Sequence, residues 1–313
     1  MTSSPHIRAK HSTRSIMLDV IIALVPALIM AVYYFGVSAA VLVGVSIVTC
    51  VLCEALYEKL LHKKNTIGDL SAVVTGILLA FNMPSGAPWW MAMLGGAFAI
   101  LLAKMLYGGI GKNFVNPALA GRAFLMACWA SPMTTFTLDG VTGPTPLSFL
   151  KTGALPEGTT MMDMFLGHIG GCLGEVSAIA LLIGGAYLLA KKVISIRIPA
   201  AYIGTVAVFA LIFPRAGGPL ESLGFEILGG GLLLGALFMA TDYTTSPVTP
   251  KGQILFGIGC GLLTVLIRRF GGYPEGVSYS ILLMNLCVWL IDKYTTPTKF
   301  GAVAPKKTEE VAK

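Results

Sequence analysis

Long apolar segments separated by short polar ones dominate the pattern of this 313-residue chain. A helix that spans a bilayer needs about 20 mostly apolar residues, and ten segments come close to that length. They lie near residues 16–35, 37–56, 68–83, 88–107, 115–130, 169–190, 197–214, 224–241, 253–270 and 276–292. The pattern therefore predicts an all-α polytopic membrane protein of about ten transmembrane helices.

The ten segments form two groups of five, and the chain divides accordingly. The expected parts are a cytoplasmic segment, a first five-helix repeat, an extracytoplasmic loop, a second five-helix repeat and a cytoplasmic tail. Their bounds are 1–15, 16–130, 131–168, 169–292 and 293–313.

The two groups repeat one another at a constant spacing. Pro84 and Pro247 are 163 residues apart, and so are Gly108 and Gly271. Because five spans is an odd number, the second group must enter the membrane from the opposite side. The sequence thus predicts an inverted repeat, in which sites form where interrupted helices meet. We expect interruptions in the helices before Pro84 and Pro247 and after Gly109 and Gly272.

Charge fixes the predicted orientation. Only 12% of the residues are charged, against roughly 25% in soluble domains. With the N-terminus inside, 17 of the 22 Lys and Arg residues fall on cytoplasmic segments, and Arg122 falls within a span. The four on the outer side are Lys151, Arg215, Arg268 and Arg269. This positive-inside bias predicts cytoplasmic termini and an outer 131–168 loop, and it explains the basic charge without nucleic acid.

The cysteines do not indicate a complete metal site. Cys50 and Cys53 lie three residues apart on one helical face, but no second Cys or His pair accompanies them. Apolar packing is the favoured interpretation, and an iron–sulfur centre shared with a partner subunit is the alternative. The chain also lacks a dinucleotide fingerprint and an iron–sulfur cysteine run. We therefore predict no metal site and no catalytic residue within the chain alone.

One Gly-rich segment is a candidate ligand site. Residues 108–122 combine several glycines with Asn113, Asn116 and Pro117. Glycines let a backbone approach a ligand, Asn side chains both donate and accept hydrogen bonds, and Pro suits the first turn of a helix. The edge of a flat heterocycle would match the two Asn side chains. The alternative is a Gly-rich turn followed by an Asn cap.

Three acidic residues stand at predicted helix ends. Asp242 lies at the end of the interrupted helix of the second repeat, Glu175 lies in the Gly-rich motif 170–177 that opens the span at 169–190, and Glu275 lies in the turn before the span at 276–292. An acid at membrane depth is expensive and is a functional hypothesis by default, so all three are candidates for ion coupling. Helix capping and favourable interaction with the helix dipole are the alternatives.

The outer loop carries the most specific motif. Its residues 139–147 read Asp-Gly-Val-Thr-Gly-Pro-Thr-Pro-Leu, which resembles the flavinylation sequence Asp-x-x-Thr-Gly-x-Thr. Further motifs lie at 111–124, 241–252 and 271–279. Together they resemble the family that contains the D subunit of the Rnf electron-transport complex and the B subunit of the sodium-pumping NADH:quinone reductase. The resemblance covers about residues 5–300.

The resemblance implies covalent FMN on Thr145 through a phosphoester, a non-covalent riboflavin at Asn113 and Asn116, and ion uptake near Asp242. Pro144 stands where the family pattern usually has Ala. The implied function is electron transfer in an Rnf-type complex that couples ferredoxin and NAD chemistry to Na⁺ or H⁺ translocation. The implied partners are the other Rnf subunits, the lipid bilayer and a flavin transferase. A flavin-free secondary transporter or channel would share the inverted repeat and is the rival interpretation.

Overall fold

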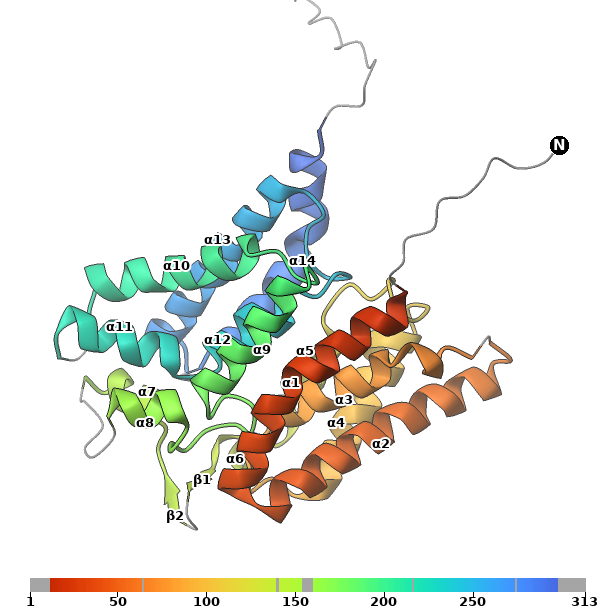
Figure 1. Ribbon diagram of the computed structural model, residues 1–313, viewed down its shortest axis with the longest axis horizontal. Helices are drawn as coiled ribbons and strands as arrows, with labels where there is room; N and C mark the ends of the chain where they lie inside the picture. Colours follow the sequence, from red (N-terminus) through yellow and green to blue (C-terminus); the bar gives the residue numbers. More distant parts are fainter. Residues whose placement is uncertain are drawn as a thin grey trace, which may run out of the picture.

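The computed structural model describes residues 12–63, 65–138, 141–153, 160–215, 217–273 and 275–297. The two predicted terminal segments lie almost wholly outside this part of the chain, as does Asp139 of the outer loop. The described chain is mostly helical, which confirms the predicted fold class (Figure 1). The helices from the first and second repeats gather in two neighbouring groups.

Each predicted span of the first repeat contains a helix. These helices are α1 (Thr13–Phe35), α2 (Val37–Leu60), α3 (Ser71–Phe81), α4 (Trp89–Phe98) and α5 (Pro117–Cys128). A single 3₁₀ turn, η1 (Ile67–Asp69), precedes α3, and α4 continues as a π-helix, η2 (Ala99–Met105). Local sequence sets the boundaries: Ser12 caps α1, while Asn116 caps α5 with Pro at its first position.

The stretch between the repeats contains short elements. They are α6 (Ala130–Thr134), β1 (Phe136–Leu138), β2 (Val141–Gly143), α7 (Pro146–Lys151) and α8 (Met161–Leu166). The two strands pair antiparallel, with Phe136 opposite Gly143. This small hairpin was not part of the predicted all-α architecture. It lies on the opposite side of the molecule from the start of α1 and the end of α14 (Figure 1).

The second repeat has the same order of helices. They are α9 (Ala178–Ala190), α10 (Arg197–Ile212), α11 (Pro219–Leu228), α12 (Leu232–Leu234), the π-helix η3 (Gly235–Met239), α13 (Pro250–Phe270) and α14 (Val277–Thr295). The pair formed by α11 and α12–η3 bends by 59° at Gly229–Gly231. The interruption expected before Pro247 is therefore present.

The interruption expected after Gly272 is absent. Helix α14 runs without a break for 19 residues, because Val277–Thr295 contains neither Gly nor Pro. Its counterpart α5 has only 12 residues and ends before Pro132. By length and apolar composition, three described helices could each cross a membrane, and the bent pair could make a fourth span. Five further apolar helices are shorter, so the count of ten spans stays a prediction.

The 163-residue repeat also appears in the hydrogen bonds. Arg122 Nη1 in α5 donates to Asn82 Oδ1 at the end of α3, over 2.9 Å. At the equivalent positions of the second repeat, Asn285 Nδ2 donates to the carbonyl of Thr245, over 2.8 Å. Helix α2 packs against α4 just as α10 packs against α13. The two halves are therefore built on one plan, with a guanidinium in the first where the second has an amide.

Candidate functional site

The Gly-rich segment after α4 lines a cavity of about 90 Å³. Asn113, Asn116 and Asp242 all contribute to its wall, so the structure brings together two of the predicted ligand residues and one predicted ion-coupling residue. The rest of the wall includes Lys104, apolar side chains from α1 and α3, and Leu188 and Phe238 from the second repeat.

Most hydrogen-bonding groups of the two asparagines are engaged within the protein. Asn116 Oδ1 accepts from the backbone amides of Ala118 and Leu119, and Asn116 Nδ2 donates to the carbonyl of Met239. This is the Asn cap of the alternative interpretation. Asn113 Nδ2 donates to the carbonyl of Val115 and to Thr244 Oγ1, while its Oδ1 accepts no hydrogen bond from a described residue. Asn113 is therefore the better placed of the two to bind a ligand.

Asp242 lies in the non-helical segment after η3. Its Oδ2 accepts hydrogen bonds from Thr244 Oγ1 at 2.9 Å and from Thr245 Oγ1 at 3.1 Å. No described cation pairs with it. Thr244 joins Asp242 to Asn113, because its hydroxyl oxygen also accepts from Asn113 Nδ2 at 2.9 Å. Asp242 thus organises a local turn and also faces the cavity.

A second and larger cavity, of about 330 Å³, lies beside the 131–168 segment. Thr145 lines it together with Arg122, Glu275 and the aromatic residues Phe136 and Tyr279. A cavity of roughly 150 Å³ is enough to hold a benzene ring. The cavity is therefore large enough for a multi-ring aromatic group, and its mainly apolar wall contains two charged residues, Arg122 and Glu275.

The Thr145 hydroxyl is an orphan in this wall. Thr145 occupies the N-cap position of α7, where a Thr hydroxyl commonly accepts a hydrogen bond from the first turn. Here the backbone carbonyl of Thr145 is the acceptor for the first turn of α7 instead. It accepts from Ser148 N at 2.9 Å and from Ser148 Oγ at 2.6 Å. Thr145 Oγ1 is buried and forms no hydrogen bond with any described residue. A buried polar atom left without a partner needs an explanation, and a covalently bound group would provide one.

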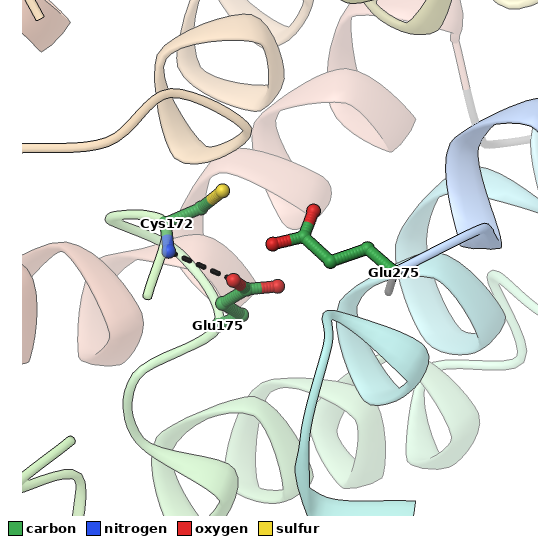
Figure 2. Close-up of side chains that lie close together, drawn as sticks. All are labelled: Cys172, Glu175 and Glu275. Carbon is green, nitrogen blue, oxygen red and sulfur yellow. Dashed lines mark hydrogen bonds between the residues drawn. The ribbon is translucent and has the colours of Figure 1, made fainter. Parts of the chain in front are cut away.

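The structure unites Glu175 and Glu275 with two residues that sequence reasoning did not associate with them. Figure 2 shows the two carboxylates and Cys172 pointing toward one another, with potential ligand atoms within 4.8 Å of each other. Glu175 Oε1 accepts from the Cys172 amide at 2.8 Å. Arg122 Nη2 forms an ion pair with Glu275 Oε2, while Glu275 Oε1 is buried without a described partner.

Backbone contacts place this cluster. The amide of Leu173 donates to the carbonyl of Met83, and that of Gly174 donates to the carbonyl of Phe81, so the loop before α9 lies against the end of α3. A Cβ atom at Gly174 would lie 2.3 Å from Phe81 Cβ, and therefore only Gly permits this approach. Residues 170–177, which include three glycines, therefore position the loop in addition to supplying Glu175.

A divalent metal does not suit the cluster. Three such residue types could coordinate one, but the Arg122 guanidinium already occupies Glu275 Oε2 and would repel a second cation beside it. Two carboxylates facing one guanidinium carry one surplus negative charge, which burial disfavours. The cluster is better matched to a proton or a monovalent cation than to a divalent metal.

Polar contacts connect the two cavities. Arg122, in the wall of the larger cavity, donates to Asn82 Oδ1. Asn82 Nδ2 lies 3.6 Å from Met239 Sδ, and the carbonyl of Met239 accepts from Asn116, in the wall of the smaller cavity.

The repeat also relates the cavities: Ile110, Asn113 and Asn116 line the smaller one. The residues 163 positions later, which are Tyr273, Gly276 and Tyr279, line the larger one.

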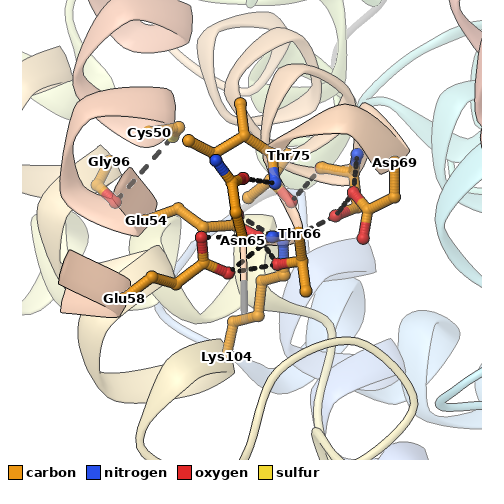
Figure 3. A network of polar contacts seen from close by, with 11 residues as sticks. Cys50, Glu54, Glu58, Asn65, Thr66, Asp69, Thr75, Gly96 and Lys104 are labelled. Carbon is orange, nitrogen blue, oxygen red and sulfur yellow. Dashed lines mark hydrogen bonds and ion pairs between the residues drawn. The ribbon is translucent and has the colours of Figure 1, made fainter. Parts of the chain in front are cut away.

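A further buried network escaped the sequence interpretation, which counted Lys104 among the cytoplasmic charges. Lys104 Nζ lies 2.6 Å from Glu54 Oε2 and 2.6 Å from Ser71 Oγ, and the Lys104 and Glu54 side chains are 3% and 0% exposed. Thr66 joins Glu54 to Glu58 (Figure 3). Charged residues within apolar segments were the signal that could have revealed this network. Cys50 is buried nearby, with Sγ 3.8 Å from the carbonyl of Gly96.

The fold and the site define a helical membrane protein of two repeated halves, with interrupted helices and a pair of interior cavities linked by buried polar groups. The chain belongs to the NQR2, RnfD, RnfE family, whose sequence model matches residues 1–301. This confirms the family resemblance drawn from the motifs.

Three relatives match nearly the whole chain. It is 52% identical to the D subunit of the Na⁺-translocating ferredoxin:NAD⁺ oxidoreductase complex of Acetobacterium woodii, over 98% of this chain and 96% of the relative. It is 44% identical to the D subunit of the proton-translocating ferredoxin:NAD⁺ oxidoreductase complex of Clostridium ljungdahlii, over 96% of each. It is 37% identical to the D subunit of the ion-translocating oxidoreductase complex of Stutzerimonas stutzeri, over 97% of this chain and 96% of the relative.

Proposed function

We propose that this chain is the membrane electron-carrying subunit of an Rnf-type ferredoxin:NAD⁺ oxidoreductase complex, with FMN bound covalently to Thr145. The observation that carries the proposal is the orphaned Thr145 hydroxyl, which lies within the flavinylation-like motif and faces a cavity of about 330 Å³. The names of the three relatives support the complex and its coupling to ion translocation. On this proposal the chain is one subunit of an oxidoreductase and is not catalytic alone.

The residues of the larger cavity fit a flavin. Phe136, Tyr273 and Tyr279 provide aromatic surface for a flat ring system. The Ser278 hydroxyl accepts from Arg122 Nη1 at 2.7 Å, so its own proton is available to a polar edge of the ring. The bound flavin would supply one- and two-electron redox chemistry. Thr145 would hold it, and the aromatic wall would orient its ring.

A second flavin, riboflavin at Asn113 and Asn116, fits the smaller cavity less well. Its volume of about 90 Å³ is below the roughly 150 Å³ that holds a single benzene ring. Asn116 is also committed to capping α5. A riboflavin there would require the cavity to widen, and Asn113 would be its main polar contact. The equivalence of the two cavities under the repeat is what supports two cofactor positions in one chain.

Two groups of acids could couple electron transfer to ion movement. The Glu175–Glu275 pair adjoins the proposed FMN cavity and has room for one positive charge. Asp242 faces the smaller cavity without a described cationic partner. Electron arrival favours uptake of a nearby positive charge, because the two charges attract strongly where the dielectric is low. The relatives' names include both Na⁺ and proton translocation, and either ion suits these carboxylates.

The proposed topology has cytoplasmic termini and an outer hairpin in the bacterial cytoplasmic membrane. In Figure 1 the start of α1 and the end of α14 lie on one side, and the hairpin beside Thr145 lies on the other. A flavin transferase would then act from outside, and the remaining Rnf subunits, including flavin and iron–sulfur subunits, would exchange electrons with this one. Cys50 and Cys53, if they contact a shared centre, would do so through a partner.

The test of the FMN proposal is the mass of the intact chain. The wild-type protein should carry the added mass of FMN and fluoresce in a denaturing gel. Thr145→Ala should remove both, because Ala has no hydroxyl to form the phosphoester, while the chain still inserts. Thr152→Ala, at an exposed position in the same outer region, is the matched control and should retain the flavin. Undiminished flavin mass in Thr145→Ala would contradict the proposal, and a colourless wild-type protein would favour the transporter.

Asp242→Asn should separate ion coupling from cofactor binding. The amide is nearly the same size and can still accept hydrogen bonds from Thr244 and Thr245, so both the turn and the flavins should be retained. The lost negative charge should lower ion uptake and ion-dependent ferredoxin:NAD⁺ turnover by roughly tenfold if it attracts the ion within a few ångströms. Turnover and uptake in membrane vesicles are the measurements. Wild-type values for both would reduce Asp242 to a helix-end turn former.

A further inference from the structure

The four basic residues that the charge distribution places on the outer side are not scattered. Lys151 at the end of α7, Arg215 after α10, and Arg268 and Arg269 at the end of α13 all line one cavity of about 380 Å³. Residues that should be rare on this side of the membrane have thus been brought to a single place. Topology does not require such a cluster, so the cavity itself calls for an explanation.

The charges in this cavity are not balanced. Glu226 of α11 is the carboxylate that pairs with them among the described residues: its Oε2 lies 2.7 Å from Arg268 Nη1, and its Oε1 lies 2.9 Å from Arg215 Nε. Lys151 Nζ donates instead to the carbonyls of Gly271 and Gly272. Four cations therefore face one anion, and the site has an excess of three positive charges.

Arg215 leaves hydrogen-bond donors free in this excess. Its side chain is only 7% exposed, yet Nη1 and Nη2 are buried and donate to no described acceptor. Arg269 Nε is likewise buried and donates to no described acceptor. Burial lowers the pKa of Arg215, and the neighbouring guanidiniums of Arg268 and Arg269 lower it further, while Glu226 acts in the opposite direction. An anion in the cavity would satisfy the donors and relieve the repulsion.

The surroundings indicate which anion. Exposed apolar side chains accompany the cavity: Phe270 in its wall is 84% exposed, and the neighbouring α10 and α13 present further exposed apolar residues. A free inorganic ion would gain nothing from that surface. A phospholipid would place its acyl chains against it and its phosphate among the guanidiniums, whose forked donors match phosphate oxygens.

We propose that this cavity binds a phosphate group, and that the group is the headgroup phosphate of an anionic phospholipid in the outer leaflet. Arg215 is its central ligand, Arg269 adds a second donor, and Lys151 and Arg268 supply positive charge from groups that the protein already holds in place. The site is independent of the proposed flavins and would stabilise the junction of α10, α11 and α13.

The test uses the purified complex in detergent. It is incubated with phosphatidylglycerol, with phosphatidylcholine or with inorganic phosphate, and retained lipid is counted by native mass spectrometry. We expect one phosphatidylglycerol in the wild type, bound about tenfold more weakly in Arg215→Gln, as loss of one charge-assisted contact predicts. The half-buried Arg269→Gln should show the same direction if Arg215→Gln assembles poorly. Arg197→Gln, an exposed change at the other end of α10, is the matched control and should bind normally.

Several outcomes would overturn the proposal. Unchanged phosphatidylglycerol retention in both variants would remove the arginines from the site, and equal retention of phosphatidylcholine would show that charge is not recognised. Binding of inorganic phosphate without any retained lipid would assign the cavity to the free ion. A carbodiimide cross-link between Lys151 and a carboxylate of another subunit would assign it to a protein partner instead.

Discussion

Lys104→Met is expected to lower the free energy of unfolding by about 3–5 kcal/mol, because it leaves a buried carboxylate without its counter-charge. Glu54 is fully buried, and Lys104 Nζ is its ion-pair partner at 2.6 Å (Figure 3). The same substitution removes the donor that lies 2.6 Å from Ser71 Oγ, which then keeps only its hydrogen bond to Asp69. Thermal or denaturant unfolding of the purified protein in detergent measures the change.

A double variant and a surface control sharpen this expectation. Removing both charges with Lys104→Met and Glu54→Leu should recover much of the loss, since an apolar pair of similar volume is often as stable as a buried ion pair. Lys191→Met removes a side chain that is 54% exposed and lies 4.0 Å from Asp19, so its effect should stay below about 1 kcal/mol. Equal unfolding energies for Lys104→Met and Lys191→Met would show that the buried pair contributes little.

Arg268→Leu should be comparably destabilising, by about 3–5 kcal/mol, and for a different reason. The guanidinium is fully buried and holds the break between α11 and α12: it donates to the Glu226 carboxylate at 2.7 Å and to the carbonyls of Glu226 and Gly229 at 2.6 and 3.0 Å. Leu would leave both carbonyls without this donor, and the Glu226 carboxylate would keep only Arg215 as a cationic partner. Arg268→Lys should recover only part of the loss, since one ammonium cannot reproduce the fork of donors.

Unfolding in detergent again gives the energy, and the pattern of loss tests the cause. If Arg268 holds the break, limited proteolysis of Arg268→Leu should cut first near Gly229–Gly231, before any other segment opens. Arg197→Leu, at the exposed start of α10, should change neither the unfolding energy nor the first cleavage site. Cleavage that begins elsewhere in Arg268→Leu would separate Arg268 from the stability of the break.

The helices and the repeat could be predicted because apolar segment length and Gly–Pro spacing are local features. Asn116 as a helix cap and Pro247 after an interrupted segment illustrate this. The bend at Gly229–Gly231 also lies inside a segment predicted to be interrupted. The interruption predicted after Gly272 was wrong. It was inferred from the Gly-Gly turn before α14, but the helix is continuous because Val277–Thr295 contains neither Gly nor Pro.

The partners of the acidic residues could not be predicted, because they come from distant parts of the chain. Glu275 meets Arg122, which is 153 residues away, and Lys104 meets Glu54 at a separation of 50 residues. Sequence spacing identifies costly charges in apolar segments, but pairing is decided by which helix ends the fold brings together. Thr145 is the converse case: its motif singled it out, and the cavity and the missing hydrogen bond appear only in three dimensions.

The correspondence between the linings of the two cavities has an evolutionary consequence. Ile110, Asn113 and Asn116 match Tyr273, Gly276 and Tyr279 position by position, as expected if one gene was duplicated and its copies were fused. An unfused ancestor would have been a half-length protein that paired with an oppositely inserted copy of itself, so that both sites were identical. Such dual insertion requires little bias in Lys and Arg. The present charge asymmetry would then be younger than the fold, and fusion would have freed each cavity to acquire its own ligand.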